Sequence, residues 1–220
     1  KSNMQTNPLK VTSKTKFTRT PKRGSFDREK AYQILDSTPM CHVSYLIDGE
    51  PYITPTLQWR TGNDLYWHGS SASRFLKAIE GKPVAINVML LDGLVLARSA
   101  FHHSANYRSV TLFGDARKLE PGEKRRHLEE FVEDILPGRW NVLRPMSNQE
   151  VRATTIFTIP IEEASVKVRD GMPIDDDEDY ELPIWAGVIP ISQIVGEPIS
   201  DTKNIDGLKT PEHVFDFSIG

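Results

Sequence analysis

The segment from Trp67 to Arg74 holds the residues whose types and spacing are best suited to chemistry. A predicted strand runs into a small turn rich in hydroxyl groups, and this turn begins a predicted helix. Free amides at a helix start and the positive end of its dipole favour an anion. Serine hydroxyls and the Arg74 guanidinium would supply further donors for a phosphate, and Gly69 would let a ligand approach the backbone. In the alternative interpretation, Ser71 or Ser73 only caps the helix and Arg74 points to solvent.

A second polar group interrupts the apolar sequence between Gly93 and Val110. Its members are Arg98, Ser99, His102, His103, Ser104, Asn106, Tyr107, Arg108 and Ser109. Unpaired buried polar groups cost about 1–3 kcal/mol each, so this density predicts a hydrogen-bond network or a ligand site. Adjacent histidines of a strand point to opposite faces, which makes His102 and His103 a poor chelating pair. A single histidine as an axial haem ligand stays open, as does a purely structural role for His68.

The composition restricts the classes of protein. With 220 residues, of which 38% are hydrophobic and 26% charged, the chain fits one domain with tails. No apolar run approaches the roughly 18 residues of a membrane span, and Lys1 to Lys22 lack the apolar core of a signal peptide. The single cysteine, Cys41, excludes an internal disulfide, and no histidine spacing of a catalytic zinc site occurs. We therefore expect a cytoplasmic protein with no metal site and no membrane contact.

The N-terminal region is basic, although the whole chain has a net charge of -3. Residues 1–30 contain nine Lys or Arg and two Asp or Glu, which gives this region a charge of +7. Such a tail could touch RNA or an anionic membrane, but no nucleic-acid motif accompanies it. We expect a disordered basic tail over residues 1–23 and no nucleic-acid partner.

Periodicity and turn residues predict mainly strands. They are expected at His42–Ile47, Tyr52–Trp59, Leu65–His68, Val84–Leu91, Leu94–Ala97, Tyr107–Leu119, Thr154–Pro160, Ala164–Arg169 and Trp185–Ile191. The continuous apolar run of Val84–Leu91 predicts burial on both faces, with a turn at Asp92-Gly93 and a loop at His102–Asn106. Hairpin connections between these strands argue for an antiparallel barrel.

Helices are expected at the periphery. The first begins at Ser25 or Asp27 and ends before Pro39, and the second follows the serine-rich turn. A longer amphipathic helix covers Pro121–Leu136, and the Ser-x-x-Glu spacing of Ser147–Glu150 predicts a short one. Asp175–Asp179 lacks the spacing of a calcium loop and is interpreted as a solvated acidic loop.

Three sequence segments together resemble the pyridoxamine 5'-phosphate oxidase-like superfamily. They are Thr54-Pro55-Thr56-Leu57, then Leu65–Gly69 with Ser73-Arg74, then Tyr107–Val110 with Gly114. The likeness is greatest to the branch that includes the nitroimidazole-resistance and flavin-nucleotide-binding proteins, and it covers roughly Phe17 to Ile191. It implies a mainly β, antiparallel split β-barrel with peripheral helices, homodimeric, with FMN at the subunit interface. The FMN-binding domain would span residues 24–192, followed by a C-terminal extension over 193–220.

The resemblance also implies site residues. Ser73 and Arg74 match the phosphate-binding Ser-Arg pair, and His68, Gly69 and Ser71 would line the phosphate and ribityl region. Pro55, Thr56, Leu57 and Gln58 would run along the isoalloxazine edge. Arg108 and Ser109 would contact the flavin of the partner subunit, Arg98 would add charge, and Trp185 would cover the site.

Departures from the oxidase pattern argue against vitamin B6 oxidation. Phe75 stands where the oxidase has a lysine after its Ser-Arg pair, and no basic residue lies between Ile53 and Gln58. The substrate-reading Arg-Leu-His-Asp-Arg segment is also missing. The first hypothesis is an FMN-dependent oxidoreductase of unknown substrate, with His68 or Tyr107 as proton relay. The alternatives are a non-catalytic flavin carrier or sensor, and a haem-binding split-barrel protein.

Overall fold

The computed structural model describes residues 7–19 and 21–220. Four α-helices span Arg28–Asp36 (α1), Arg74–Ile79 (α2), Lys124–Ile135 (α3) and Asn148–Ala153 (α4). The strands are Gly24–Ser25 (β1), Met40–Ile47 (β2), Glu50–Thr61 (β3), Asp64–Ser70 (β4), Pro83–Leu96 (β5), Ser104–Asp115 (β6), Arg117–Lys118 (β7), Thr154–Pro160 (β8), Glu163–Arg169 (β9) and Gly187–Pro190 (β10). Short 3-10 helices span Pro21–Arg23, Ala100–His102, Trp140–Val142, Asp177–Glu181 and Glu212–Asp216.

All the strands form one antiparallel sheet in the order β1-β9-β6-β5-β2-β3-β4-β8-β7, with β10 added to β5. The predicted fold class, mainly antiparallel β with peripheral helices, is confirmed. Among the described residues, no helix is long and apolar enough to cross a membrane.

The core lies inside the curled sheet, because alternate strand residues point inward. Trp67 and Phe157 stack there with ring centroids 5.8 Å apart, and both are fully buried. A second, smaller apolar cluster between the sheet and α3 contains Trp59, Tyr66 and Leu128. These two clusters hold β3 and β4 between them, and so fix the strands that lead into the serine-rich turn.

The local helix signals act as expected. Asp27 caps α1 by accepting a hydrogen bond from the Glu29 amide, and Ser73 caps α2 through the Leu76 amide. Ser147 and Glu150 form the predicted capping box at α4. The residues around these caps are therefore held at helix starts, as their sequence spacing requires.

The expected turn at Asp92-Gly93 is wrong. β5 continues through this point to Leu96, with a register shift against β6 between Leu91 and Gly93. Such a bulge bends the strand without ending it. A Cβ atom on Gly93 would lie 3.0 Å from the carbonyl oxygen of Ile189 in β10, so glycine permits this close strand contact.

Other expectations for β5 and β6 need smaller corrections. Val84–Leu91 is not buried on both faces, because Met89 and Leu91 are exposed while Val88 and Leu90 are buried. The expected loop at 102–106 is shorter, since β6 begins at Ser104. The expected strand to Leu119 ends at Asp115 and resumes as β7.

The basic N-terminal segment packs on the barrel over residues 7–19, although its composition predicts disorder. Leu9 is 2% exposed, and its amide donates to the Phe26 carbonyl oxygen at 2.8 Å. The Lys10 amide donates to the Glu162 carbonyl oxygen at the same distance. The buried Leu9 side chain and these two backbone hydrogen bonds thus attach a polar segment to the barrel. The first six residues of the expected tail lie outside the described residues.

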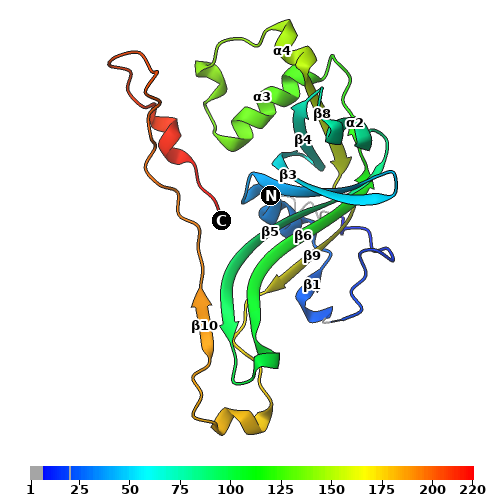
Figure 1. Ribbon diagram of the computed structural model, residues 1–220, viewed down its shortest axis with the longest axis vertical. Coiled ribbons are helices and arrows are strands. Elements are labelled where there is room, and N and C mark those ends of the chain that lie inside the picture. Colours follow the sequence, from blue (N-terminus) through cyan, green and yellow to red (C-terminus); the bar gives the residue numbers. More distant parts are fainter. Residues whose placement is uncertain (1–6, 20) are drawn as a thin grey trace, which may run out of the picture.

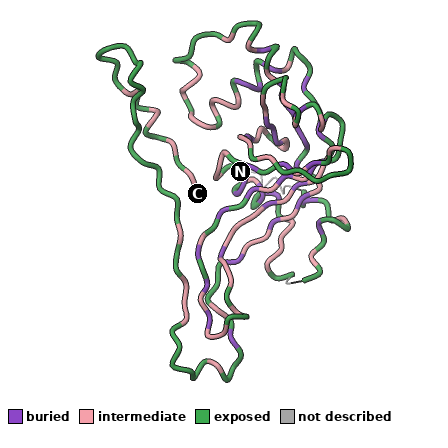
Figure 2. Tube along the Cα trace, in the orientation of Figure 1, coloured by how far each residue is buried: buried purple, intermediate pink, exposed green. Residues whose placement is uncertain are grey.

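The ends of β5 and β6 extend from the barrel as a curved arm, with β10 along its outer side (Figure 1). The chain then continues as a C-terminal extension, residues 193–220, which runs beside the barrel and is largely exposed (Figure 2). The barrel, the arm and the extension are the three parts that carry the candidate site residues and their surroundings.

Replacing Gly93 with Ala should lower the free energy of unfolding by about 1–3 kcal/mol, because the new methyl group forces β10 away from β5. Urea unfolding measures the difference. Gly122→Ala is the matched control, since a Cβ at Gly122 meets nothing within 4 Å. Equal free energies of unfolding for the two variants would show that the close contact between Gly93 and β10 does not require glycine.

Candidate functional site

The serine-rich turn joins β4 to α2 at one end of the barrel. The Ser71 amide donates to the Ala153 carbonyl oxygen at 2.8 Å, which ties the turn to the end of α4. The hydroxyl of Ser73 is engaged in the cap of α2, while Ser71 is exposed. A Cβ on Gly69 would lie 2.8 Å from Cδ1 of Leu76, so the small residue lets α2 pack close to β4.

Arg74 is exposed on this turn and lies with its guanidinium carbon 5.7 Å from the centre of the Tyr52 ring. It forms no ion pair with any residue in the described part of the chain. An exposed guanidinium with no carboxylate beside it can bind an anion from solution.

The other two candidate arginines are paired within the chain. Arg98 donates to Asp175 through both its backbone amide and its guanidinium, each at 3.0 Å. Arg108 makes two bonds of 2.9 Å to the carboxylate of Asp92. Each arginine therefore makes two hydrogen bonds to one carboxylate, which compensates the positive charge of its guanidinium. Of the three arginines, Arg74 is the one with a free charge.

The four candidates on β3 differ in exposure. Pro55 is exposed, and Thr56 and Leu57 are half-buried, so these three can face a ligand. Gln58 is 1% exposed, and its amide donates to the carbonyl oxygens of Leu35 and Thr38. The Gln58 side chain thus joins β3 to the end of α1 instead of pointing outward.

His68 lies at the edge of the second apolar cluster. Its ring centroid is 4.5 Å from that of Phe131 and 5.8 Å from that of Trp59. Burial lowers the pKa of His68, so the imidazole is held in its neutral form. Its Nδ1 atom is buried and has no hydrogen-bond partner among the described residues. The neutral ring therefore has an unused nitrogen.

The two histidines of the arm are different. The Nδ1 atom of His103 lies 2.8 Å from the carbonyl oxygen of Ser99, and the ring is exposed. His102 lies 3.5 Å from the carboxylate of Asp176. The His103 contact is local and supports the turn between β5 and β6, whereas the His102 contact joins this turn to the segment between β9 and β10.

The remaining candidates also belong to the arm or its base. Tyr107 and Ser109 are half-buried on β6, where Ser109 is opposite Met89 of β5. Trp185 is 69% exposed just before β10. Figure 1 shows the β4–α2 turn near one end of the molecule and the arm at the other. The structure thus brings together the residues of the turn, but not the turn and the arm of the same chain.

Other chemistry is limited in the described residues. They contain no cluster of three or more His, Cys, Asp or Glu that could hold a metal ion. Cys41 is buried, and burial raises the pKa of its thiol to about 12. A thiol of this kind is not activated as a nucleophile.

Three functional candidates were missed from the sequence. Asp175 was interpreted as part of a solvated loop, which is wrong, because its side chain is fully buried against Arg98. Asp92 was assigned to a turn, yet it holds Arg108. His213, in the C-terminal extension, has a buried Nε2 atom without a partner in the part of the chain that the structure covers. No local pattern marks these residues, because Asp92 and Asp175 pair with arginines 16 and 77 residues away.

Comparisons with known proteins place these features in a family. The sequence model of the pyridoxamine 5'-phosphate oxidase family matches residues 27–168. A search of curated protein sequences gives no match. The structure of the flavocytochrome Anf3 from Azotobacter vinelandii is similar with 43% identity and a TM-score of 0.92, covering 95% of this chain and 98% of the other.

Two further solved structures are similar. The FAD and heme binding protein from Mycobacterium smegmatis has 35% identity and a TM-score of 0.86, covering 89% of this chain and 97% of that protein. A protein from Bacteroides thetaiotaomicron named for 5-nitroimidazole antibiotic resistance has 20% identity and a TM-score of 0.54, over 64% and 84% of the two chains. The last shares the fold alone. The matched family model and the two nearly full-length relatives show that this chain belongs to the pyridoxamine 5'-phosphate oxidase family.

Proposed function

We propose that this protein binds a flavin nucleotide in a site shared by two copies of the chain, and acts as a flavin-dependent oxidoreductase. The observation that carries the proposal is Arg74, an exposed guanidinium without an ion-pair partner among the described residues, on a turn rich in hydroxyl groups. Arg74 would bind the flavin phosphate, and the hydroxyl of Ser71 would add a donor. The family relationship supports the same assignment.

FMN is the cofactor that the sequence resemblance implies, and FAD is its alternative. The relative with 35% identity is named as an FAD and heme binding protein, and the one with 43% as a flavocytochrome. Both flavins carry a phosphate that Arg74 would bind. Mass identification of the flavin released from purified protein distinguishes them.

A second copy would complete the site. Pro55, Thr56 and Leu57 lie on β3, which pairs with β4 before the turn. Ser109 lies on β6 at the base of the arm, and Trp185 lies just before β10. Because the arm extends away from its own turn, its residues would reach the flavin held by another copy (Figure 1).

The flavin itself supplies the electron-transfer chemistry, and the protein orients it and sets the local charge. His68 and Tyr107 are the residues proposed to move a proton. A non-catalytic flavin carrier would use the same binding residues. Rapid reoxidation of the reduced protein by a defined acceptor favours the enzyme, whereas inert and tightly held flavin favours the carrier.

Replacing Arg74 with Ala should weaken FMN binding about 10- to 100-fold, because one charged hydrogen-bonding group contributes about 1.5–3 kcal/mol. Quenching of FMN fluorescence on titration with protein measures the dissociation constant. Lys77→Ala is the control, since Lys77 is exposed one turn along α2. Equal affinity of the Arg74 variant and the parent would exclude Arg74 as the phosphate ligand.

Haem binding is a second candidate function, favoured by the unused nitrogen of His68. A neutral imidazole with a free nitrogen is a ligand for haem iron. Among the three histidines considered from the sequence, only His68 has a buried nitrogen without a described partner. The names of the two nearly full-length relatives support this candidate.

If His68 binds haem iron, the Soret band that appears on adding haem should be lost in His68→Ala and kept in His103→Ala. Because burial lowers the pKa of His68, the neutral ligand should persist as the pH falls below the ordinary histidine value of about 6.5. Absorbance titration with haem at several pH values measures both effects. An unchanged Soret band in His68→Ala would remove this residue as the ligand.

A further inference from the structure

A row of aromatic rings leads from His68 to α3. The ring centroids of His68 and Trp59 are 5.8 Å apart. Trp59 stacks on Tyr66 at 5.5 Å with 16° between the ring planes, and Tyr66 stacks on His127 of α3 at 4.5 Å. This aromatic row is therefore continuous from the candidate cofactor site to the helix.

The register of the sheet explains why these side chains meet. Tyr66 and His68 are two residues apart on β4, so they point to the same face of the sheet. Trp59 of β3 is opposite Tyr66 across the strand pair. Trp59, Tyr66 and His127 are all buried, so water is excluded between their rings.

Trp59 and Tyr66 are the members of the row that can give up an electron. Among aromatic side chains, indole and phenol lose an electron most readily. An oxidised indole is acidic at its N–H group, and it is trapped where a neighbouring acceptor takes that proton. The Nε1 atom of Trp59 is buried and has no hydrogen-bond partner among the described residues. Oxidised Trp59 would therefore keep its proton and take an electron from Tyr66.

Tyr66 differs from Trp59, because carboxylates lie near it. Burial raises the pKa of Tyr66, and the negative charges of Asp64 and Glu130 raise it further. Asp64 lies two residues before Tyr66 on the same face of β4, and burial raises the pKa of its carboxyl group. A carboxylate with a raised pKa is a stronger base than an ordinary one. Asp64 can thus accept the phenol proton when Tyr66 gives up an electron.

We infer that Trp59 and Tyr66 form an electron relay that protects the redox site, by supplying one electron to a strongly oxidising state of the cofactor beside His68. This inference rests on the proposed cofactor site. With a photo-excited flavin as the oxidant, Trp59 gives one electron to the flavin and Tyr66 gives one to Trp59, while the phenol proton moves to Asp64. The net change is one electron gained by the flavin, and one electron and one proton lost by Tyr66.

The far end of the row is where a reductant from solution restores Tyr66. The Nδ1 atom of His127 lies 2.7 Å from the Glu130 carboxylate, and the side chain of the neighbouring Arg126 is 71% exposed. A small anionic reductant such as ascorbate can approach the row beside this guanidinium. It returns the electron to Tyr66, and the proton returns from Asp64.

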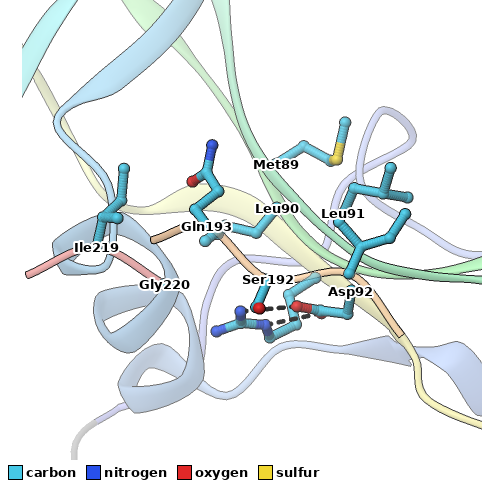
Figure 3. Close-up of a pocket in the computed structure, with 10 residues that line it drawn as sticks. Met89, Leu90, Leu91, Asp92, Ser192, Gln193, Ile219 and Gly220 are labelled. Atoms are coloured by element: carbon cyan, nitrogen blue, oxygen red, sulfur yellow. Dashed lines mark hydrogen bonds and ion pairs between the residues drawn. The ribbon is translucent and has the colours of Figure 1, made fainter. Parts of the chain in front are cut away.

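A cavity of about 560 Å³ beside β5 offers no such path. Figure 3 shows Met89, which is 53% exposed, at this cavity with Leu91 and Ile219. None of the described residues that line the cavity is aromatic. The thioether of Met89 can be oxidised but lies outside the aromatic row, so this residue serves as a control.

Flash illumination of the FMN-loaded protein tests the relay by electron paramagnetic resonance, which does not depend on turnover. We expect a tyrosyl radical, whose spectrum narrows when the tyrosines carry ring deuterium. The signal should be lost in Tyr66→Phe, which removes a single hydroxyl group, and kept in Met89→Leu. It should also be lost in Trp59→Phe and kept in Trp67→Phe, which removes another fully buried indole. A tyrosyl radical of undiminished yield in Tyr66→Phe would overturn the relay.

The proton step is tested with Asp64→Asn. Tyr66 should be oxidised at least about 10-fold more slowly, because a positioned proton acceptor contributes on the order of 10²–10⁴-fold to such a step. Transient absorption of the tyrosyl radical measures the rate, and Asp48→Asn, at an exposed turn, is the control. An equal rate in Asp64→Asn and the parent would contradict the proton transfer to Asp64. Ascorbate should shorten the lifetime of the radical, and a lifetime independent of ascorbate would contradict the restoring step.

The relay and the flavin site fail in different ways, because FMN binding is measured by fluorescence before illumination. A chain that binds FMN but forms no radical on Tyr66 contradicts the relay and supports the flavin site. A chain that binds no FMN contradicts the flavin site and, since the oxidant is then missing beside His68, the relay as well.

Discussion

β5 and β6 pair over twelve positions, and this long ribbon determines where the candidate residues of the arm and its base lie. Its first part belongs to the barrel, where Ile86, Val88 and Leu112 are buried in the main core. Its second part, from Gly93 onward, extends beyond the barrel. There β10 pairs with β5, and polar contacts such as Arg98 with Asp175 stabilise the end of the ribbon. The bulge at Gly93 marks the change from one part to the other, because the strand must bend there without losing its partner.

The two parts of the ribbon are stabilised by different interactions. In the barrel, aliphatic and aromatic side chains exclude water, and the sheet needs few side-chain hydrogen bonds. At the arm, Arg98 with Asp175 and Arg169 with Asn106 join segments that an apolar core does not hold. Such bonds have a fixed geometry and so keep the arm in one shape. A preformed arm can contact another copy without first losing much conformational entropy.

Local sequence signals predicted the barrel well, because the interactions concerned are short in range. Asp27, Ser73 and Ser147 cap helices within three residues of themselves, and strand alternation depends on adjacent positions. The need for glycine at position 93 could not be predicted in this way, since it depends on β10 almost a hundred residues later. The Arg98–Asp175 pair spans 77 residues, so an arginine considered for a cofactor is paired within the fold. The assignment of site residues from sequence therefore remains a prediction. The structure favours Arg74 over Arg98 and Arg108, because the latter two are paired with carboxylates of the same chain.

The distribution of free and paired charge restricts the ligand. Asp92 and Asp175 compensate Arg108 and Arg98, so neither arginine offers a free positive charge to a ligand. Arg74 keeps a free positive charge on the turn. In the proposed function, the anionic end of the ligand would therefore lie at Arg74. A flavin nucleotide fits the proposed function, because it has a phosphate at one end and an uncharged isoalloxazine ring at the other.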